Sequence, residues 1–122
     1  MNTATTTIET REVPYYKAVA ITIFKQLGGA KFTAMTGCKH IVYGKDEQGD
    51  AYLQMHMGRN KINANRIIIT LTDLDLYNME FYQVVLRKNG DIINKSLCKH
   101  TNLYDDMLQS TFTEVTGLRT HL

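Results

Sequence analysis

The middle of the chain alternates between apolar and polar residues with a period of two, and polar turn sequences interrupt this alternation at short intervals. The alternation is clearest over residues 51–57. Because successive side chains of a β-strand point to opposite faces of a sheet, such a segment predicts a strand with one buried face. Other segments have strand character as well: 41–43, 66–72, 77–86 and 91–98. Together these segments predict an antiparallel sheet of about five strands.

Turn sequences indicate how these strands follow one another. The charged, glycine-containing segment 45–50 predicts a hairpin between the first two strands. Asn89-Gly90 lies between apolar runs and is the preferred sequence of a tight type I′ turn, so the flanking segments are expected to pair antiparallel. The apolar positions change phase after residue 82, which predicts a β-bulge near Tyr82-Gln83.

Helical periodicity appears on both sides of the predicted sheet. Apolar residues over 16–27 recur at the spacing of one helix face, and Pro14 and Gly28-Gly29 suit the start and the end of that helix. A second apolar stripe predicts a helix from about residue 102 to residue 116, which Gly117 ends. The order helix, strands, helix predicts an α+β fold whose two helices pack on one face of the sheet.

Length and composition agree with one domain. The chain has 122 residues, 43% of them hydrophobic, and this is enough for a core that needs neither a disulfide nor a metal. Residues 1–13 include five threonines and few large aliphatic residues, so they predict a flexible N-terminal arm before a domain over 14–122. No apolar run approaches the roughly 20 residues that cross a bilayer, and no secretion signal is apparent. We therefore expect a cytoplasmic protein without a membrane partner.

Three segments resemble a known family. They are QLGGAKFTAMTGCKH at 26–40, RIIITLTDLDLYNMEF at 66–81 and LYDDMLQSTFTEVTGL at 103–118. Together they resemble a family of small proteins, usually without an assigned function, that bacteriophages, prophages and other mobile elements encode. The resemblance supplies no catalytic residues, and the family pattern does not include the cysteine and histidine beside Lys39. It implies expression in the cytoplasm of a bacterial host.

The net charge of +2 conceals an uneven distribution of charge. Residues 17–66 carry a charge of +5, whereas residues 67–122 carry −2. The segment 58–66 concentrates cations and asparagines, which suit contacts with phosphates, and nearby aromatic residues could stack on bases. The predicted nucleic-acid-binding residues are Arg59, Asn60, Lys61, Asn63, Arg66 and Lys39.

The leading functional hypothesis is a small non-enzymatic accessory protein of a phage or mobile element that binds nucleic acid through this basic loop. Two alternatives stay open. The same charges also fit an ordinary solvated sheet face. A protein-binding module that modulates a host defence or replication complex would instead dock through the acidic half of the chain or an exposed strand edge.

Carboxylate pairs raise the question of an enzyme. Asp73 and Asp75 lie near a strand end, and Asp105-Asp106 lie in the first turn of a predicted helix. Turn chemistry explains the first pair and the helix dipole explains the second. We therefore expect no catalytic residue and no cofactor.

Cysteine and histidine recur in two identical tripeptides, Cys38-Lys39-His40 and Cys98-Lys99-His100. Residues two apart on an extended chain project to one side, so the two pairs could together form a tetrahedral zinc site. However, a C-x-H spacing is a weak match to recognised zinc motifs. We expect two free thiols and no metal site, with zinc bound by Cys38, His40, Cys98 and His100 as the alternative.

Overall fold

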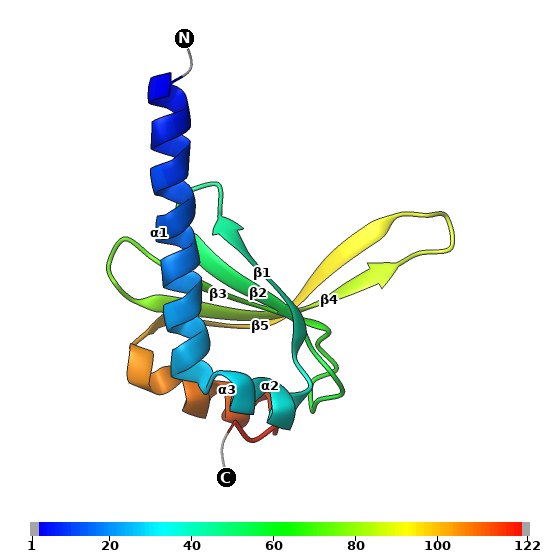
Figure 1. The fold of residues 1–122 in the computed structure, drawn as a ribbon. Coiled ribbons are helices and arrows are strands. Elements are labelled where there is room, and N and C mark those ends of the chain that lie inside the picture. Colours follow the sequence, from blue (N-terminus) through cyan, green and yellow to red (C-terminus); the bar gives the residue numbers. More distant parts are fainter. Residues whose placement is uncertain (1–2, 121–122) are drawn as a thin grey trace.

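The computed structural model describes the backbone of residues 3–120 and the side chains of residues 14–120. Its elements, in chain order, are α1 (Thr3–Leu27), α2 (Ala30–Thr36), β1 (Lys39–Lys45), β2 (Ala51–His56), β3 (Arg66–Leu71), β4 (Tyr77–Leu86), β5 (Ile92–Leu103), the 3-10 turn η1 (Asp105–Met107) and α3 (Leu108–Thr116) (Figure 1). The five strands form one antiparallel sheet in the order β1-β2-β3-β4-β5. The predicted α+β fold is therefore confirmed.

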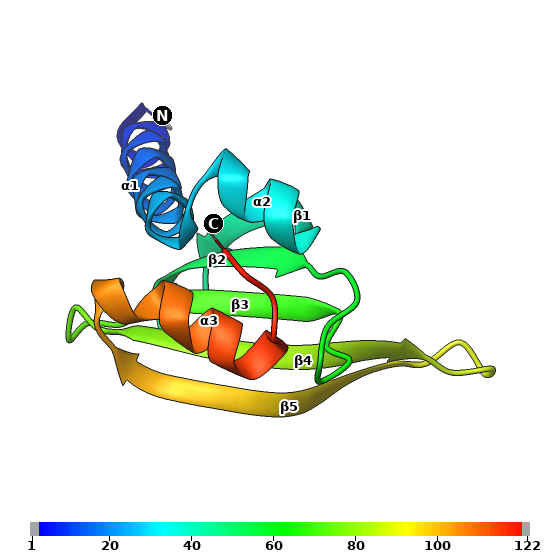
Figure 2. The same cartoon turned by 90° about the horizontal axis from the view of Figure 1, so that it is seen from below.

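The helices lie on one face of the sheet, as predicted (Figure 2). Alternate residues of the inner strands point toward these helices and are buried, while their neighbours in sequence point to the opposite face. No element of the described chain covers that opposite face (Figure 2). The uncovered face is therefore available for contacts with other molecules.

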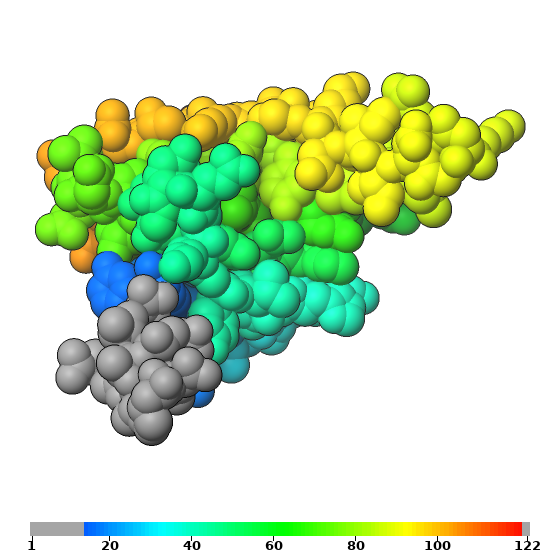
Figure 3. All heavy atoms as spheres, turned by 90° about the horizontal axis from the view of Figure 1, so that it is seen from above, coloured from blue at the N-terminus to red at the C-terminus, as the bar shows by residue number. Residues whose placement is uncertain are grey.

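The five strands form a meander, in which each strand pairs antiparallel with the next. The connections between strands therefore alternate between the two ends of the sheet. The β2–β3 loop (57–65) and the β4–β5 turn (87–91) lie at one end. The β1–β2 turn (46–50) and the β3–β4 turn (72–76) lie at the other. Figure 3 shows the β4–β5 hairpin projecting from the body at the end opposite these two turns. Residues that are distant in sequence thus share one end of the molecule.

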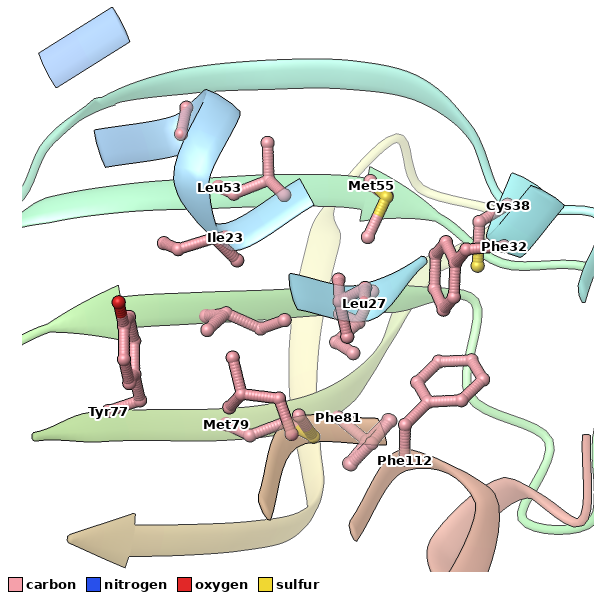
Figure 4. Packing of buried hydrophobic residues seen from close by; sticks show 14 of the residues in the cluster. Ile23, Leu27, Phe32, Cys38, Leu53, Met55, Tyr77, Met79, Phe81 and Phe112 are labelled. Atoms are coloured by element: carbon pink, nitrogen blue, oxygen red, sulfur yellow. The ribbon is translucent and has the colours of Figure 1, made fainter. Parts of the chain in front are cut away.

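The core lies between the sheet and the helices (Figure 4). The Phe112 ring of α3 packs against the Phe32 ring of α2, with ring centroids 4.9 Å apart, and lies 6.1 Å from the Phe81 ring of β4. From α1, the buried residues are Val19, Ala20, Ile23 and Leu27, all on the stripe that the periodicity predicts. The strands contribute buried aliphatic, methionine and aromatic side chains: Ala51, Leu53, Met55, Ile67, Ile69, Tyr77, Met79 and Phe81.

The N-terminal helix is longer than the sequence predicts. Its backbone is helical from Thr3, whereas a flexible arm over 1–13 and a start near Pro14 were expected. Extending a packed helix costs less than nucleating a new one, which allows threonine-rich sequence to continue it. Pro14 lies inside α1 and not in its first turn. The short helix α2 was not predicted, because seven residues are too few for a clear periodic signal.

The C-terminal helix begins later than predicted. Strand β5 continues to Leu103, so Thr101 and Asn102 lie in a strand and not at the start of the helix. The 3-10 turn η1 follows, and α3 begins at Leu108. Leu103 also fits the apolar stripe of the predicted helix, but it pairs with Tyr77 of β4, and this tertiary pairing extends β5. Gly117 ends helix α3, as predicted. Gly117 adopts a left-handed φ of 75° and donates its N–H to the Thr113 carbonyl.

The β4–β5 hairpin is confirmed, but its turn is not type I′. A type I′ turn requires positive φ at Asn89, whereas within 87–91 the positive φ is that of Gly90, at 93°. Gly90 N–H donates to the Arg87 carbonyl (3.0 Å), and Arg87 N–H donates to the Asp91 carbonyl (2.8 Å). These bonds fit a type I turn followed by a left-handed glycine.

A bulge is present near the predicted position, but on the partner strand. Phe81 pairs with Cys98 and Tyr82 pairs with Ser96, so the additional residue is Leu97 of β5. A bulge shifts two strands relative to each other. The phase change in the sequence of β4 therefore could not identify which strand holds the additional residue.

Candidate nucleic-acid interface

The pairing register sets four side chains beside one another on the uncovered face. Lys39 pairs with His56, His56 with Arg66, and Arg66 with Tyr82. Residues directly opposite each other on neighbouring strands project to the same face. The buried neighbours of these residues point to the helices, so the four side chains point away from them. We call Lys39, His56, Arg66 and Tyr82 the basic row.

A fifth side chain, His40, joins the basic row through a strand irregularity. The register of β1 shifts between Lys39 and Val42, and His40 has a left-handed φ of 54°. This backbone brings the ring centroids of His40 and His56 to 4.7 Å, in an edge-to-face arrangement. Burial lowers the pKa of His56, and the charges of Arg66, His40 and Lys39 lower it further. Lys39 and Arg66 are cations, so the row carries positive charge.

Hydrogen bonds hold the β2–β3 loop, which follows His56, against neighbouring elements. Asn65 binds the backbone of Val84 twice: its Oδ1 accepts the Val84 N–H (2.8 Å) and its Nδ2 donates to the Val84 carbonyl (3.0 Å). Lys61 N–H donates to the Thr116 carbonyl at the end of α3 (2.9 Å). The Gln83 side chain donates to the Asn63 carbonyl (3.2 Å). The loop is therefore anchored to both β4 and α3.

Asn60 is a structural residue of this loop. Its Nδ2 donates to the carbonyls of Gly58 (2.8 Å) and Ala64 (2.6 Å). Its Oδ1 accepts the N–H groups of Ile62 (3.2 Å) and Ala64 (3.1 Å). The side chain is buried and uses its full capacity for hydrogen bonds within the chain. The prediction that Asn60 contacts nucleic acid is therefore corrected.

The other predicted contact residues are accessible. Arg59, Lys61 and Asn63 are exposed on the loop, and Lys39 is exposed on β1. Arg66 is half-buried, and one guanidinium nitrogen donates to the Asn65 carbonyl (3.0 Å). A depression of about 440 Å³ lies in the loop, with Arg59, Asn60 and Asn63 among its lining residues. The structure thus brings Lys39 and Arg66 together on the sheet, while Arg59, Lys61 and Asn63 extend from the loop beside them.

Sequence reasoning missed His40, His56 and Tyr82. The period-two pattern over 51–57 does place His56 on the polar face of its strand. No local signal indicates that it lies opposite Lys39 and Arg66, because that neighbourhood depends on the register of three strands.

A second feature of the uncovered face is a hollow with acidic side chains, about 350 Å³ in volume. It lies near the β1–β2 turn, and we call it the acidic hollow. Asp46, Asp50 and Glu80 line it together with Gln48, Ile68, Thr70, Asn78 and Lys99. Burial raises the pKa of Asp50, and the charges of Asp46 and Asp73 raise it further. Carboxylates therefore crowd this part of the molecule.

The turns at the two ends of the sheet carry opposite charges. The loop 57–65 and the turn 87–91 contain Arg59, Lys61, Arg87 and Lys88 against a single carboxylate, Asp91. The turns 46–50 and 72–76 contain five carboxylates and no cation. The sheet therefore has a cationic end and an acidic end, and each end combines one connection from the basic half of the sequence with one from the acidic half.

The zinc alternative requires four ligands at one point, and the structure separates them. Cys38 precedes β1 and His40 belongs to it, whereas Cys98 and His100 belong to β5 at the opposite edge of the sheet. Four strand spacings of about 4.8 Å place these edges roughly 19 Å apart. Among the side chains of residues 14–120, no group of three or more from His, Cys, Asp or Glu is placed to hold a metal. Both cysteines are free thiols, as predicted.

Comparison of the chain with protein-family models, curated proteins and solved structures finds no match. Of the helices described here, none is both long enough and apolar enough to cross a membrane. The basic row and the loop beside it are the features on which we base a functional proposal.

Proposed function

We propose that this chain binds single-stranded nucleic acid on the basic row, with the loop cations Arg59 and Lys61 extending the contact. The observation that carries the proposal is the register that sets Lys39, His56 and Arg66 side by side on the uncovered face. Cations at these positions suit phosphate oxygens, and each neutralised phosphate releases a counterion. Such a patch of positive charge favours a polyanion.

Aromatic rings within the row favour a single strand over a duplex. Tyr82 continues the row on β4, and the His40 and His56 rings lie together at its other end. Unpaired bases can stack on such rings, and this stacking tolerates any base sequence. A sheet face that combines rings with cations is a common platform for single-stranded nucleic acid.

As part of the same proposal, the chain is a non-enzymatic accessory protein that acts in the cytoplasm of a bacterial host. The resemblance to phage and mobile-element proteins supports this context. The carboxylates Asp73 and Asp75 lie on an exposed turn, where they need no catalytic role.

The edge strand β1 favours a second candidate function, binding of a host protein. Ile41, Val42 and Tyr43 are 43%, 48% and 41% exposed, and within residues 3–120 β2 is the one strand that pairs with β1. An apolar groove of about 150 Å³, lined in part by Ile21 and Phe24 of α1, lies next to Ile41 and Tyr43. An extended peptide could pair with this edge as a sixth strand. Failure to bind oligonucleotides at low salt would favour this alternative.

Neutralising two cations of the basic row tests the nucleic-acid proposal. We expect Lys39→Gln combined with Arg66→Gln to weaken binding of a labelled single-stranded oligonucleotide about tenfold or more at low salt. The slope of log affinity against log salt should become shallower by about 1.4, since each phosphate contact on a single strand contributes about 0.7. Fluorescence anisotropy over a series of salt concentrations measures both quantities.

The matched control is Lys25→Gln combined with Lys31→Gln, which removes the same charge from exposed positions on α1 and α2. Its oligonucleotide affinity should stay within about twofold of the unmodified protein. Equal losses in the two double variants would show attraction by net charge alone and would contradict a site at the row.

Oligonucleotide binding should also tighten as the pH falls. Because burial and neighbouring cations hold the pKa of His56 below 6.5, its imidazole is neutral at pH 7.5 and gains a proton only at lower pH. A phosphate beside it would stabilise the protonated ring. We expect a gain of about three- to tenfold in affinity between about pH 7.5 and about pH 5. The gain should shrink in His56→Gln and persist in His100→Gln, whose residue lies on β5; an unchanged gain in His56→Gln would contradict this role.

A further inference from the structure

The tip of the β4–β5 hairpin carries an exposed apolar pair. Leu86 is 72% exposed and Ile92 is 68% exposed, and the two residues face each other across the hairpin. The hairpin projects away from the body of the protein (Figure 1, Figure 3). Single exposed apolar residues are ordinary, but a pair on a projecting ribbon has the form of a contact surface.

The same tip is cationic. Arg87 and Lys88 follow Leu86 directly and are exposed. The one carboxylate of the turn, Asp91, accepts a hydrogen bond from the Asn89 side chain (3.0 Å). We call residues 86–92 the cationic tip.

The complementary surface lies at the other end of the sheet. The acidic hollow is lined there by Asp46, Asp50 and Glu80, against a single lining cation, Lys99. In the neighbouring β3–β4 turn, Leu74 is 70% exposed and stands between two exposed carboxylates, Asp73 and Asp75. This end therefore combines a concave acidic surface with an exposed apolar side chain. It complements the cationic tip, which combines cations with an exposed apolar pair.

We propose that the cationic tip of one copy of this chain docks into the acidic hollow of a second copy. Arg87 and Lys88 would meet the carboxylates, and Leu86 and Ile92 would cover apolar surface near Leu74. A chain cannot make this contact with itself, because its own tip and hollow lie at opposite ends of the sheet. Opposite charges on the two surfaces favour a second copy over other partners, and like charges disfavour pairing of two identical ends.

This contact is heterologous, since it joins two different surfaces. Each copy has one tip and one hollow, so copies would add head to tail and form open chains or rings. The basic row contains none of the residues of the tip or the hollow. The two proposals therefore rest on different side chains, and either can fail without the other.

The experiment uses two variants that each block one surface. Arg87→Glu with Lys88→Glu reverses the tip, and Asp50→Lys with Asp73→Lys reverses the acidic end. Asp46 is left intact because its carboxylate caps its own turn, accepting the N–H groups of Gln48 and Asp50. Sedimentation velocity of nucleic-acid-free protein at low and high salt, over a range of concentrations, measures the assembly.

We expect the unmodified protein to assemble at low salt and to dissociate as salt is added. Each blocked variant alone should stay monomeric, with association weakened about tenfold or more. An equimolar mixture of the two should assemble again, because the intact tip meets the intact hollow and the reversed tip meets a reversed hollow of opposite charge. Restored assembly is specific to a contact between tip and hollow, and a misfolded variant could not produce it.

Matched controls reverse equal charges elsewhere: Lys25→Glu with Lys31→Glu, and Asp106→Lys with Glu114→Lys. Both should assemble like the unmodified protein. The milder Arg87→Gln with Lys88→Gln should weaken association in the same direction as the reversal. A monomeric unmodified protein at low salt, assembly that survives in either blocked variant, or a mixture that stays monomeric would each overturn the proposal.

Discussion

Replacing Phe112 with alanine should lower the free energy of unfolding by about 3–5 kcal/mol, the usual cost of removing a buried aromatic ring. The Phe112 side chain is fully buried. Its ring contacts Phe32 from α2 and lies near Phe81 from β4, so one substitution leaves a cavity where three elements meet. Urea denaturation followed by circular dichroism measures the change.

The control for this prediction is Leu86→Ala. Leu86 is 72% exposed, so we expect its truncation to change the free energy of unfolding by less than about 0.5 kcal/mol. Similar losses in the two variants would mean that Phe112 is not a central part of the core. A small effect of Phe112→Ala would mean that α3 packs more loosely on the sheet than the ring contacts indicate.

Replacing Asn60 with alanine should cost about 2–4 kcal/mol, because it leaves buried backbone groups of the β2–β3 loop without partners. Four hydrogen bonds to Gly58, Ile62 and Ala64 depend on this side chain. Denaturant unfolding gives the overall loss, and hydrogen exchange of the amides over 58–65 shows whether the loop opens locally.

Asn63→Gly is the matched control in the same loop. Asn63 is exposed and has a φ of 61°, which glycine adopts without strain, so stability should change by less than about 0.5 kcal/mol. If Asn60 served nucleic acid instead, Asn60→Ala would weaken oligonucleotide binding while stability stayed unchanged. That result would contradict the structural role assigned to Asn60.

Most of the fold could be predicted because its signals are local. Alternation identified β2, β3 and most of β4, and the apolar stripe identified the part of α1 that packs on the sheet. The errors occurred where local patterns compete with tertiary pairing. Leu103 begins the apolar stripe of the predicted helix, yet residues 101–103 extend β5, because Leu103 pairs with Tyr77 of β4.

The candidate site could be predicted only in part. Arg59, Lys61 and Arg66 stand close together in sequence, so their common position was visible as a basic loop. Asn60 belongs to the same run but is bonded inside the loop, a difference that composition cannot reveal. His56 and Tyr82 join the row through pairing with residues that are 10 or more positions away.

By itself, the sequence determined which segments form strands and which face of each strand is buried, because these properties follow from a period of two along the backbone. The tertiary structure decided which charges are neighbours. The sequence divides its charge between two halves, but the meander returns to each end of the sheet at every second turn. Arg59 and Arg87 thus share the cationic end, and Asp46 and Asp73 share the acidic end, since register and strand order are non-local.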